Sequence, residues 1–319
     1  MKSVLLGRTG ITVSSLCYGT MSFGGDADDA TSFALYRACR DAGISFFDCA
    51  ATYNGGRSEA LLGEFVAADR DAITITTKCG YGSASDPRGN GSRLEIVTSV
   101  EASLRRLKTD RLDVLFMHRF DPATDLHVTL KALEDVVRAG KVLHLGASNY
   151  AAWQIAKALG LSARHGWAGF AVIQPMYNLV KRQAEVELLP LAEEEGLGVI
   201  SYSPLGGGLL TGKYARDGAG RLTANDRYAR RYGPDWMHKA ATGLSEMAEK
   251  RGLHPASLAV AWAGAHPGVT APIIGARSVE QLRPSLASAD IEMTQALYAE
   301  ISALAPAPPP ATDRLEEQD

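Results

Sequence analysis

The amino-acid sequence predicts an α/β fold: a closed (β/α)8 TIM barrel with an N-terminal β-hairpin and extra helices. Short apolar or β-branched runs alternate with longer amphipathic runs almost from end to end, which is typical of parallel strands joined by helices. The length of 319 residues suits one barrel of ~250 residues plus insertions. After the first barrel strand the chain reads GTMSFGGD, which lacks the G-x-G-x-x-G motif of an open dinucleotide-binding sheet.

The predicted strands begin with a hairpin whose arms are residues 4–6 and 11–13, turning at Thr9 and Gly10. Runs of this length, rich in Val, Ile and Phe, are typical of buried parallel strands. The eight barrel strands are expected at residues 15–18, 45–47, 73–77, 112–117, 142–146, 170–173, 198–201 and 272–274.

Apolar residues recur at helical spacing between these strands. Helices are expected at residues 29–42, 57–68, 94–107, 124–139, 151–159, 185–195, 240–251, 255–265, 279–287 and 294–304. Glycines that commonly end helices stand just past four of them, at Gly43, Gly140, Gly160 and Gly196. Residues 81–93 and 206–236 fit neither pattern, and long loops of this kind are usually functional or disordered.

We expect residues 1–305 to form one barrel domain and residues 306–319, Pro-rich and then charged, to form a flexible tail.

The composition is ordinary for a globular protein, with 46% apolar residues, 22% charged residues and a net charge of −3, and it suggests neither nucleic acid nor membrane as a partner. The four cysteines form no CxxC pair, which predicts free buried thiols. No signal peptide or membrane span is recognisable, so a cytoplasmic location is expected, with monomer and homo-oligomer both open.

Four reactive side chains stand at or just after the ends of three neighbouring predicted strands. Asp48 ends the second barrel strand, Tyr53 follows it in the same loop, Lys78 ends the third strand and His118 the fourth. Barrel enzymes carry their active-site groups at the C-terminal ends of strands. We therefore expect the four groups to converge on one catalytic site.

These groups suit the reduction of a carbonyl compound. Hydride transfer to carbon leaves negative charge on oxygen, which Tyr53 can protonate, although its reference pKa of ~10 makes it a weak acid. The ammonium of Lys78 would lower that pKa, Asp48 would pair with the buried Lys78, and His118 would orient the carbonyl. The sequence has no G-x-S-x-G or HExxH motif, so hydrolysis and a metal site fit worse.

The sequence resembles the aldo-keto reductase family over roughly residues 3 to 290. The segments that carry this resemblance are FFDCAATYNGGRSEALLGE, ITTKCG, DVLFMHRFDP, LGASNY, YSPLGGGLLTGKY and PIIGARSVEQL, in this order. The resemblance implies that Tyr53 is the general acid and base, tuned by Lys78 and Asp48, and that His118 orients the substrate. It also implies a nicotinamide cofactor.

The cofactor residues that the resemblance implies fall into groups. The nicotinamide carboxamide would be held by Ser148, Asn149 and Gln174, and the nicotinamide ring would stack on Tyr202. The cofactor would be lined by Gly19, Thr20 and Met21, and its pyrophosphate would meet Ser203, Leu205, Gly207 and Lys213. The C-terminal cofactor segment would contain Gly275, Arg277, Ser278 and Gln281. A guanidinium suits a 2′-phosphate, so Arg277 favours NADPH, with NADH possible. Pro284 and Ser285 stand where many members carry an acidic residue and Asn, which leaves the adenine contacts open.

The substrate pocket is expected to draw on Phe23, Tyr53, Tyr81, Arg119, Phe120 and residues 227–236. These permit aldehydes, ketones, sugars or α-keto acids. Two alternatives to a reductase remain at this point: an NAD(P)-dependent sugar or alcohol dehydrogenase that uses the same site, and a cofactor-binding sensor or scaffold subunit with slow turnover.

Overall fold

The computed structural model describes residues 1–82, 90–215, 218 and 220–314. Within them, eight parallel strands close into a barrel in the order β10-β3-β4-β5-β6-β7-β8-β9, which confirms the predicted fold. The strands are β3 (Cys17–Gly19), β4 (Phe46–Asp48), β5 (Thr74–Cys79), β6 (Leu112–Met117), β7 (Val142–Ser148), β8 (Phe170–Gln174), β9 (Gly198–Ser201) and β10 (Ala271–Ile274). Each lies within two residues of its expected position.

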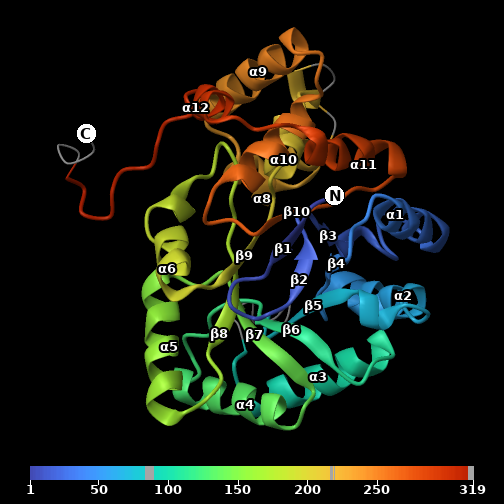
Figure 1. The fold of residues 1–319 in the computed structure, drawn as a ribbon, viewed down its shortest axis with the longest axis vertical. Helices are drawn as coiled ribbons and strands as arrows, with labels where there is room; N and C mark the ends of the chain where they lie inside the picture. Colours follow the sequence, from blue (N-terminus) through green and yellow to red (C-terminus); the bar gives the residue numbers. More distant parts are fainter. Residues whose placement is uncertain (83–89, 216–217, 219, 315–319) are drawn as a thin grey trace.

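Helices surround the barrel (Figure 1). They are α1 (Asp29–Asp41), α2 (Arg57–Phe65), α3 (Arg93–Leu107), α4 (Leu126–Arg138), α5 (Ala152–His165), α6 (Leu188–Glu195), α9 (Asp235–Lys250), α10 (Pro255–Ala265), α11 (Val279–Leu286) and α12 (Gln295–Ser302). Side-chain caps fix several starts: Asp28 accepts from the backbone N–H of Thr31 at 2.8 Å, which satisfies one of the N–H groups that a helix start leaves unpaired.

Residues 206–236 are more regular than their sequence indicates. They contain the 3-10 turns η5 (Gly206–Thr211) and η6 (Lys213–Ala215) and the short helices α7 (Arg221–Ala224) and α8 (Asp226–Arg231), while residues 216, 217 and 219 lie outside the described part. In the other irregular stretch, residues 83–89 also lie outside it. After α12, residues 303–314 form neither helix nor strand, and residues 315–319 of the predicted tail are not described.

The N-terminal hairpin closes one end of the barrel. Its strands β1 (Ser3–Leu5) and β2 (Thr12–Ser14) pair antiparallel, each shifted by one residue from its expected position. Leu6 continues the hairpin through its N–H, which donates to the backbone oxygen of Ile11 at 2.9 Å, while its side chain is fully buried in the barrel interior with Phe46 and Phe116. The hairpin turn packs closely against the start of β9, because a Cβ on Gly7 would lie only 2.2 Å from the backbone nitrogen of Gly198.

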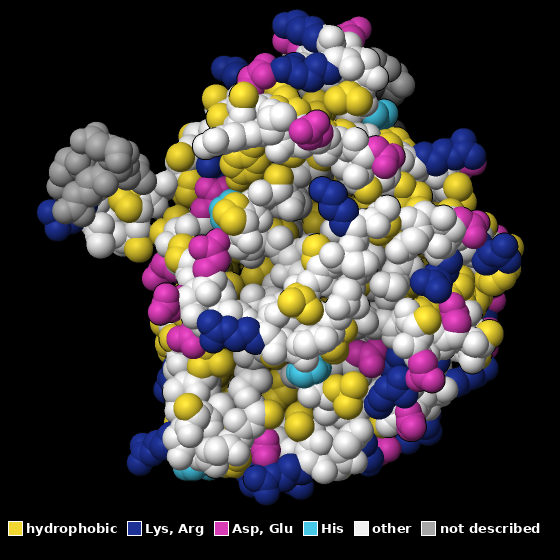
Figure 2. All heavy atoms as spheres, viewed as in Figure 1, with side chains coloured by type: hydrophobic (Ala, Val, Ile, Leu, Met, Phe, Trp, Pro, Cys, Tyr) yellow, Lys and Arg dark blue, Asp and Glu magenta, His cyan; other side chains and the backbone are white. Residues whose placement is uncertain are grey.

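The barrel interior and its outer shell form separate apolar clusters. Val114, Phe116, Val172 and Ile200 fill the interior, whereas the helices pack on the outward-facing side chains. Side chains therefore fill the interior of the barrel, and active sites of barrel enzymes lie at the C-terminal ends of the strands. Figure 2 shows the face that carries the hairpin, and basic and acidic side chains are interspersed around the edge of that face.

All four cysteines belong to the described residues, and each is a free, buried thiol, as the sequence indicates. No helix in the described part of the chain is long and apolar enough to cross a membrane.

Helix α5 continues past the point where the sequence predicts its end. Gly160 lies inside α5 on its exposed side, and the helix ends at Gly166, whose φ of 65° is left-handed. Ser162, in the turn after Gly160, is buried against the barrel, and this packing outweighs the low helix propensity of glycine.

Gly160→Ala should therefore stabilise the protein by about 0.5–1 kcal/mol, because alanine loses less backbone entropy on entering a helix. An added Cβ meets no atom within 4 Å there. Urea unfolding monitored by circular dichroism measures the change. Gly166→Ala is the matched control and should destabilise, since alanine resists a positive φ; the opposite order would place the helix end at Gly160.

Candidate active site

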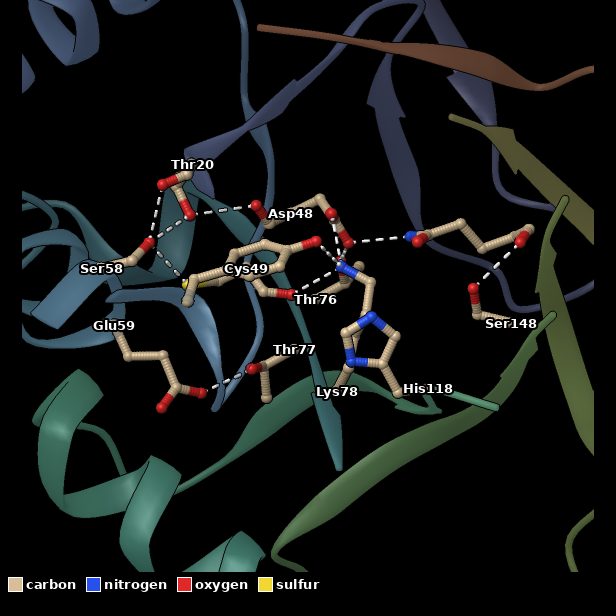
Figure 3. A network of polar contacts seen from close by, with 12 residues as sticks. Thr20, Asp48, Cys49, Ser58, Glu59, Thr76, Thr77, Lys78, His118 and Ser148 are labelled. Atoms are coloured by element: carbon tan, nitrogen blue, oxygen red, sulfur yellow. Dashed lines mark hydrogen bonds and ion pairs between the residues drawn. The ribbon is translucent and has the colours of Figure 1, made fainter. Parts of the chain in front are cut away.

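The four reactive side chains meet at the C-terminal ends of β4, β5 and β6. Figure 3 labels three of them, Asp48, Lys78 and His118. Asp48 is the last residue of β4, Lys78 lies in β5, and His118 directly follows β6. Tyr53 begins the 3-10 turn η2 (Tyr53–Gly56), which folds back sharply because its last three residues have positive φ values. This turn returns the tyrosine hydroxyl to the strand ends.

Lys78 is the centre of the group. Its ammonium, on a side chain only 1% exposed, donates to Asp48 Oδ2 at 2.6 Å, to the backbone oxygen of Cys49 at 2.7 Å and to the Tyr53 hydroxyl at 3.2 Å. These three acceptors match its three N–H groups. A buried ammonium is tolerated when it is paired and hydrogen-bonded in this way.

Asp48 is equally well satisfied. Its second oxygen, Oδ1, accepts from Thr76 Oγ1 at 2.7 Å and from Gln174 Nε2 at 2.9 Å. The strand register explains the first contact, because Thr76 of β5 pairs directly with Asp48 of β4. The Asp48 carboxylate is thus held by hydrogen bonds from β5 on one side and from β8 across the barrel.

The surroundings set the protonation states of the lysine and the tyrosine. Burial disfavours the charged form of Lys78, but Asp48 and Tyr53 outweigh it and raise its pKa, so the ammonium persists. Burial raises the pKa of Tyr53 to about 12, although Lys78 acts to lower it. Lys78 therefore acts in the expected direction, but burial is the larger effect, so the net pKa of Tyr53 is raised.

His118 is held neutral. Burial, with the positive charges of Lys78 and Arg119, lowers its pKa to about 3. Its Nδ1 atom is buried with no hydrogen-bond partner among the described residues, and its ring lies 4.6 Å from that of Tyr81 between centroids. Because His118 also lines the cavity over the site, its neutral imidazole is suited to hydrogen-bond a polar ligand atom through a ring nitrogen.

A cavity of about 930 Å³, called the cleft below, opens over these side chains. Lys78 lies beneath its surface. Of the sequence-predicted residues, the following line it: Asp48, Tyr53, His118, Gly19, Met21, Ser148, Asn149, Gln174, Tyr202, Ser203, Leu205, Gly207, Lys213, Gly275, Arg277 and Gln281.

Two predicted cofactor residues have other partners and do not line the cleft. Thr20 is buried, and its hydroxyl lies 2.8 Å from Ser58 Oγ and donates to the backbone oxygen of Asp48. Ser278 caps α11, where its hydroxyl accepts from the backbone N–H of Gln281. Both therefore shape the wall of the cleft from behind.

One end of the cleft is connected to the catalytic group by hydrogen bonds. Ser148 donates to the backbone oxygen of Gln174 at 3.1 Å, Asn149 to that of His118 at 2.8 Å, and Tyr202 to Asn149 Oδ1 at 2.8 Å. Asn149 takes the left-handed conformation, with φ of 56°, which asparagine tolerates better than most residues. The residues predicted to hold a nicotinamide thus form one connected wall beside Tyr53.

The other end carries the features of a phosphate site. Gly206, Gly207 and Gly208 in η5 all have positive φ values, and a Cβ on Gly207 would lie 2.7 Å from the ring of Tyr228, so glycine is required there. Lys213 lies against the same turn, with its Cε 3.0 Å from a Cβ built on Gly208. A tight glycine turn with a cation beside it fits the pyrophosphate of a dinucleotide.

Arg277, the predicted 2′-phosphate ligand, is engaged with Asp26: the Nε–Oδ2 distance is 2.9 Å and both side chains are about half exposed. Its backbone N–H donates to Gln281 Oε1 at 3.2 Å. In the neighbouring helix, Pro284 borders the cleft, whereas Ser285 is 1% exposed and does not line it. Any adenine contact from this turn therefore comes from residues other than Ser285.

Some of the predicted substrate residues line the cleft and others do not. Tyr81, Arg119, Arg227, Tyr228 and Arg231 line the cleft. Phe23 is instead fully buried and packs in the core against Tyr18 and Phe65, where a large aromatic side chain gains most from burial. Phe120 is partly buried and packs on Tyr150 and Trp153, and it does not line the cleft. Both expectations were therefore wrong.

Sequence reasoning missed two useful residues. Thr76, which anchors Asp48, is two positions before Lys78 in β5 and so faces the same side of the strand; that spacing could have indicated it. Arg221, which lines the cleft, follows the glycine turn, but nothing in its local sequence separates it from a surface arginine.

The barrel thus holds a buried Lys–Asp pair with a tyrosine hydroxyl beside it, under a cleft of about 930 Å³. The chain belongs to the aldo/keto reductase family, whose model matches residues 15–306. It is 37% identical over 324 aligned residues to the uncharacterized oxidoreductase YrpG of Bacillus subtilis, covering 97% of each chain.

Other relatives have different names. A probable voltage-gated potassium channel subunit beta of Oryza sativa is 36% identical, with 90% of each chain covered. A norsolorinic acid reductase of Aspergillus flavus is 32% identical, with 93% of this chain and 79% of the relative covered. Family membership and the oxidoreductase names support an oxidoreductase that acts on small molecules.

The buried pair makes a prediction about stability. Lys78→Met keeps the side-chain shape but leaves Asp48 buried without a cation, and should cost about 3–5 kcal/mol of unfolding free energy. Chemical denaturation measures the loss. Lys78→Met with Asp48→Asn removes both charges and should lose less than Lys78→Met alone; an equal or greater loss would show that the charge pair is not the cause.

Proposed function

We propose that the chain reduces aldehydes and ketones to alcohols with NADPH, with Tyr53 as the general acid. The observation that carries this proposal is the Tyr53 hydroxyl at 3.2 Å from the buried Lys78 ammonium, on a tyrosine that lines the cleft. The relatives named as reductases support the same reaction class.

The cofactor, when bound, supplies a hydride to the carbonyl carbon. Tyr53 donates its hydroxyl proton to the carbonyl oxygen as charge develops there, so the product is an alcohol. Lys78 stabilises the phenolate left behind, and Asp48 keeps Lys78 charged and in place. His118, neutral at physiological pH, orients the carbonyl oxygen by a hydrogen bond.

The protonation state of Tyr53 fits the reductive direction. With a pKa of about 12, its phenol is protonated at neutral pH and ready to donate, whereas alcohol oxidation needs the phenolate as a base. The dehydrogenase alternative would show faster turnover with NAD⁺ and an alcohol than with NADPH and a carbonyl. A channel-subunit-like role would show bound NADPH that no carbonyl compound oxidises.

Tyr53→Phe tests the general acid. The ring and its packing remain, so NADPH affinity should stay within about twofold, while kcat/KM for reduction should fall about 100- to 10,000-fold. Stopped-flow NADPH oxidation and fluorescence titration measure the two effects. Tyr81→Phe removes a hydroxyl from the same cleft and should keep most of the activity; near-wild-type turnover in Tyr53→Phe would refute the assignment.

Arg277 tests the choice of cofactor. Arg277→Ala should weaken NADPH binding by roughly 10- to 100-fold, the value of a charge-assisted contact, with NADH affected little. Asp26→Asn should tighten NADPH binding by up to about fivefold, because a half-exposed ion pair that competes with the phosphate is worth at most about 1 kcal/mol. Equal weakening of both cofactors by Arg277→Ala would contradict a 2′-phosphate role.

A further inference from the structure

The wall of the cleft is strongly cationic. Its described lining includes Arg119, Lys213, Arg221, Arg227, Arg231 and Arg277, against the carboxylates of Asp48 and Glu280. Asp48 is neutralised by Lys78, and Glu280 belongs to α11 at the predicted adenine end. The positive charge of this wall therefore far exceeds its negative charge. The face in Figure 2 differs, because basic and acidic side chains are interspersed around its edge.

Several of these cations have no carboxylate partner. Arg277 pairs with Asp26, and Arg119 lies over the Tyr81 ring at 4.7 Å. In contrast, no described carboxylate lies within 4.0 Å of a charged nitrogen of Lys213, Arg221, Arg227 or Arg231. Cations gathered in a concave site without partners are suited to bind an anionic ligand.

A dinucleotide accounts for only part of this charge. Lys213 lies against the glycine turn, and its Nζ is 2.4 Å from a Cβ built on Gly220, the residue before Arg221. Lys213 and Arg221 thus belong to the pyrophosphate end. The two remaining cations, Arg227 and Arg231, lie one helical turn apart on α8.

Arg231 lines the cleft between the glycine turn and Tyr202. It lies beside Tyr228, whose ring packs against the glycine turn at Gly207. Its positive charge also acts on Tyr202, opposing the larger effect of burial, which raises the pKa of that tyrosine. Tyr202 in turn donates to Asn149, which contacts His118. The guanidinium is partly buried and lies 5.5 Å from the centre of the Tyr228 ring, so an aromatic surface helps to fix its position.

The charge of Arg231 also acts on a second cation, Lys181. This lysine is partly buried near the Tyr232 ring, 6.0 Å from its centre. Burial and then the charge of Arg231 lower the pKa of Lys181. Two unpaired like charges in a partly buried place repel each other, and a bound anion would relieve this repulsion.

We propose that the substrate carries an anionic oxygen group, a carboxylate or a phosphate, and that Arg231, assisted by Arg227, binds this group while the carbonyl lies at Tyr53 and His118. The inference rests on the proposed function, since it names the class of carbonyl compound reduced. A guanidinium can grip either anion through two parallel N–H donors. Arg231 is thus a specificity-determining residue.

Matched substrate pairs test the proposal. We would compare 4-carboxybenzaldehyde with methyl 4-formylbenzoate, and glyceraldehyde 3-phosphate with glyceraldehyde, in the wild type, Arg231→Met, Arg231→Lys and Arg230→Met. Arg230 is the matched control because it is the preceding residue of α8, is exposed and does not line the cleft. Whichever anionic member is preferred over its neutral partner identifies the anion as carboxylate or phosphate.

The wild type should favour at least one anionic member by about tenfold or more in kcat/KM. Arg231→Met should lower kcat/KM for that member by about 10- to 100-fold, mainly through KM, and leave its neutral partner nearly unchanged. Arg231→Lys should recover part of the loss, and Arg230→Met should show none. Equal use of the charged and neutral members by the wild type would overturn the proposal.

Binding measurements separate this inference from the proposed function. Calorimetry with NADP⁺ present would compare 4-(hydroxymethyl)benzoate with its methyl ester, and 3-phosphoglycerol with glycerol, in wild type and Arg231→Met. Selective binding of an anion that Arg231→Met abolishes supports the inference even if no carbonyl is turned over, in which case only the proposed function fails. If Arg231→Met instead weakens NADPH binding in the binary complex and leaves anion selectivity intact, Arg231 serves the cofactor and the inference is wrong.

Discussion

The buried ion pair between Lys78 and Asp48 is the constraint on which the site depends. Two charges at the centre of a barrel are stable only if every donor and acceptor is satisfied. Neighbouring strands supply the partners: β5 contributes both Thr76 and Lys78, and β4 contributes Asp48 in register with Thr76. The parallel pairing of β4 and β5 therefore fixes the positions of the reactive groups before any ligand binds.

The same pair determines what Tyr53 can do. The third N–H of Lys78 donates to the Tyr53 hydroxyl. Burial raises the pKa of this tyrosine, so its phenol is protonated at neutral pH. His118 is neutral for a related reason, because burial and the nearby cations disfavour its protonation. The catalytic group therefore consists of one charged pair and two neutral donors, an arrangement suited to delivering a proton to an oxygen that becomes negative.

Strand positions and the convergence of the four reactive residues could be predicted from the sequence, because both depend on local periodicity and on the rule that barrel sites lie at strand C-termini. Details set by tertiary packing could not. Gly160 continues a helix because its neighbours are buried, and Phe23 lies in the core and not in the cleft. The net pKa of Tyr53 depends on how far burial exceeds the effect of Lys78, and the ion pair of Arg277 with Asp26 joins two distant loops; neither leaves a local signal.

The most direct test of this account is the titration of Tyr53 itself. Tyrosine labelled with 13C at the ring carbon that bears the hydroxyl gives an NMR signal that reports ionisation, and the spectrum of Tyr53→Phe identifies which signal belongs to Tyr53. We expect this signal to remain that of a neutral phenol through physiological pH and to titrate near a pKa of about 12. A midpoint below the ordinary tyrosine value of about 10 would contradict the claim that burial outweighs Lys78 and holds Tyr53 as a protonated acid.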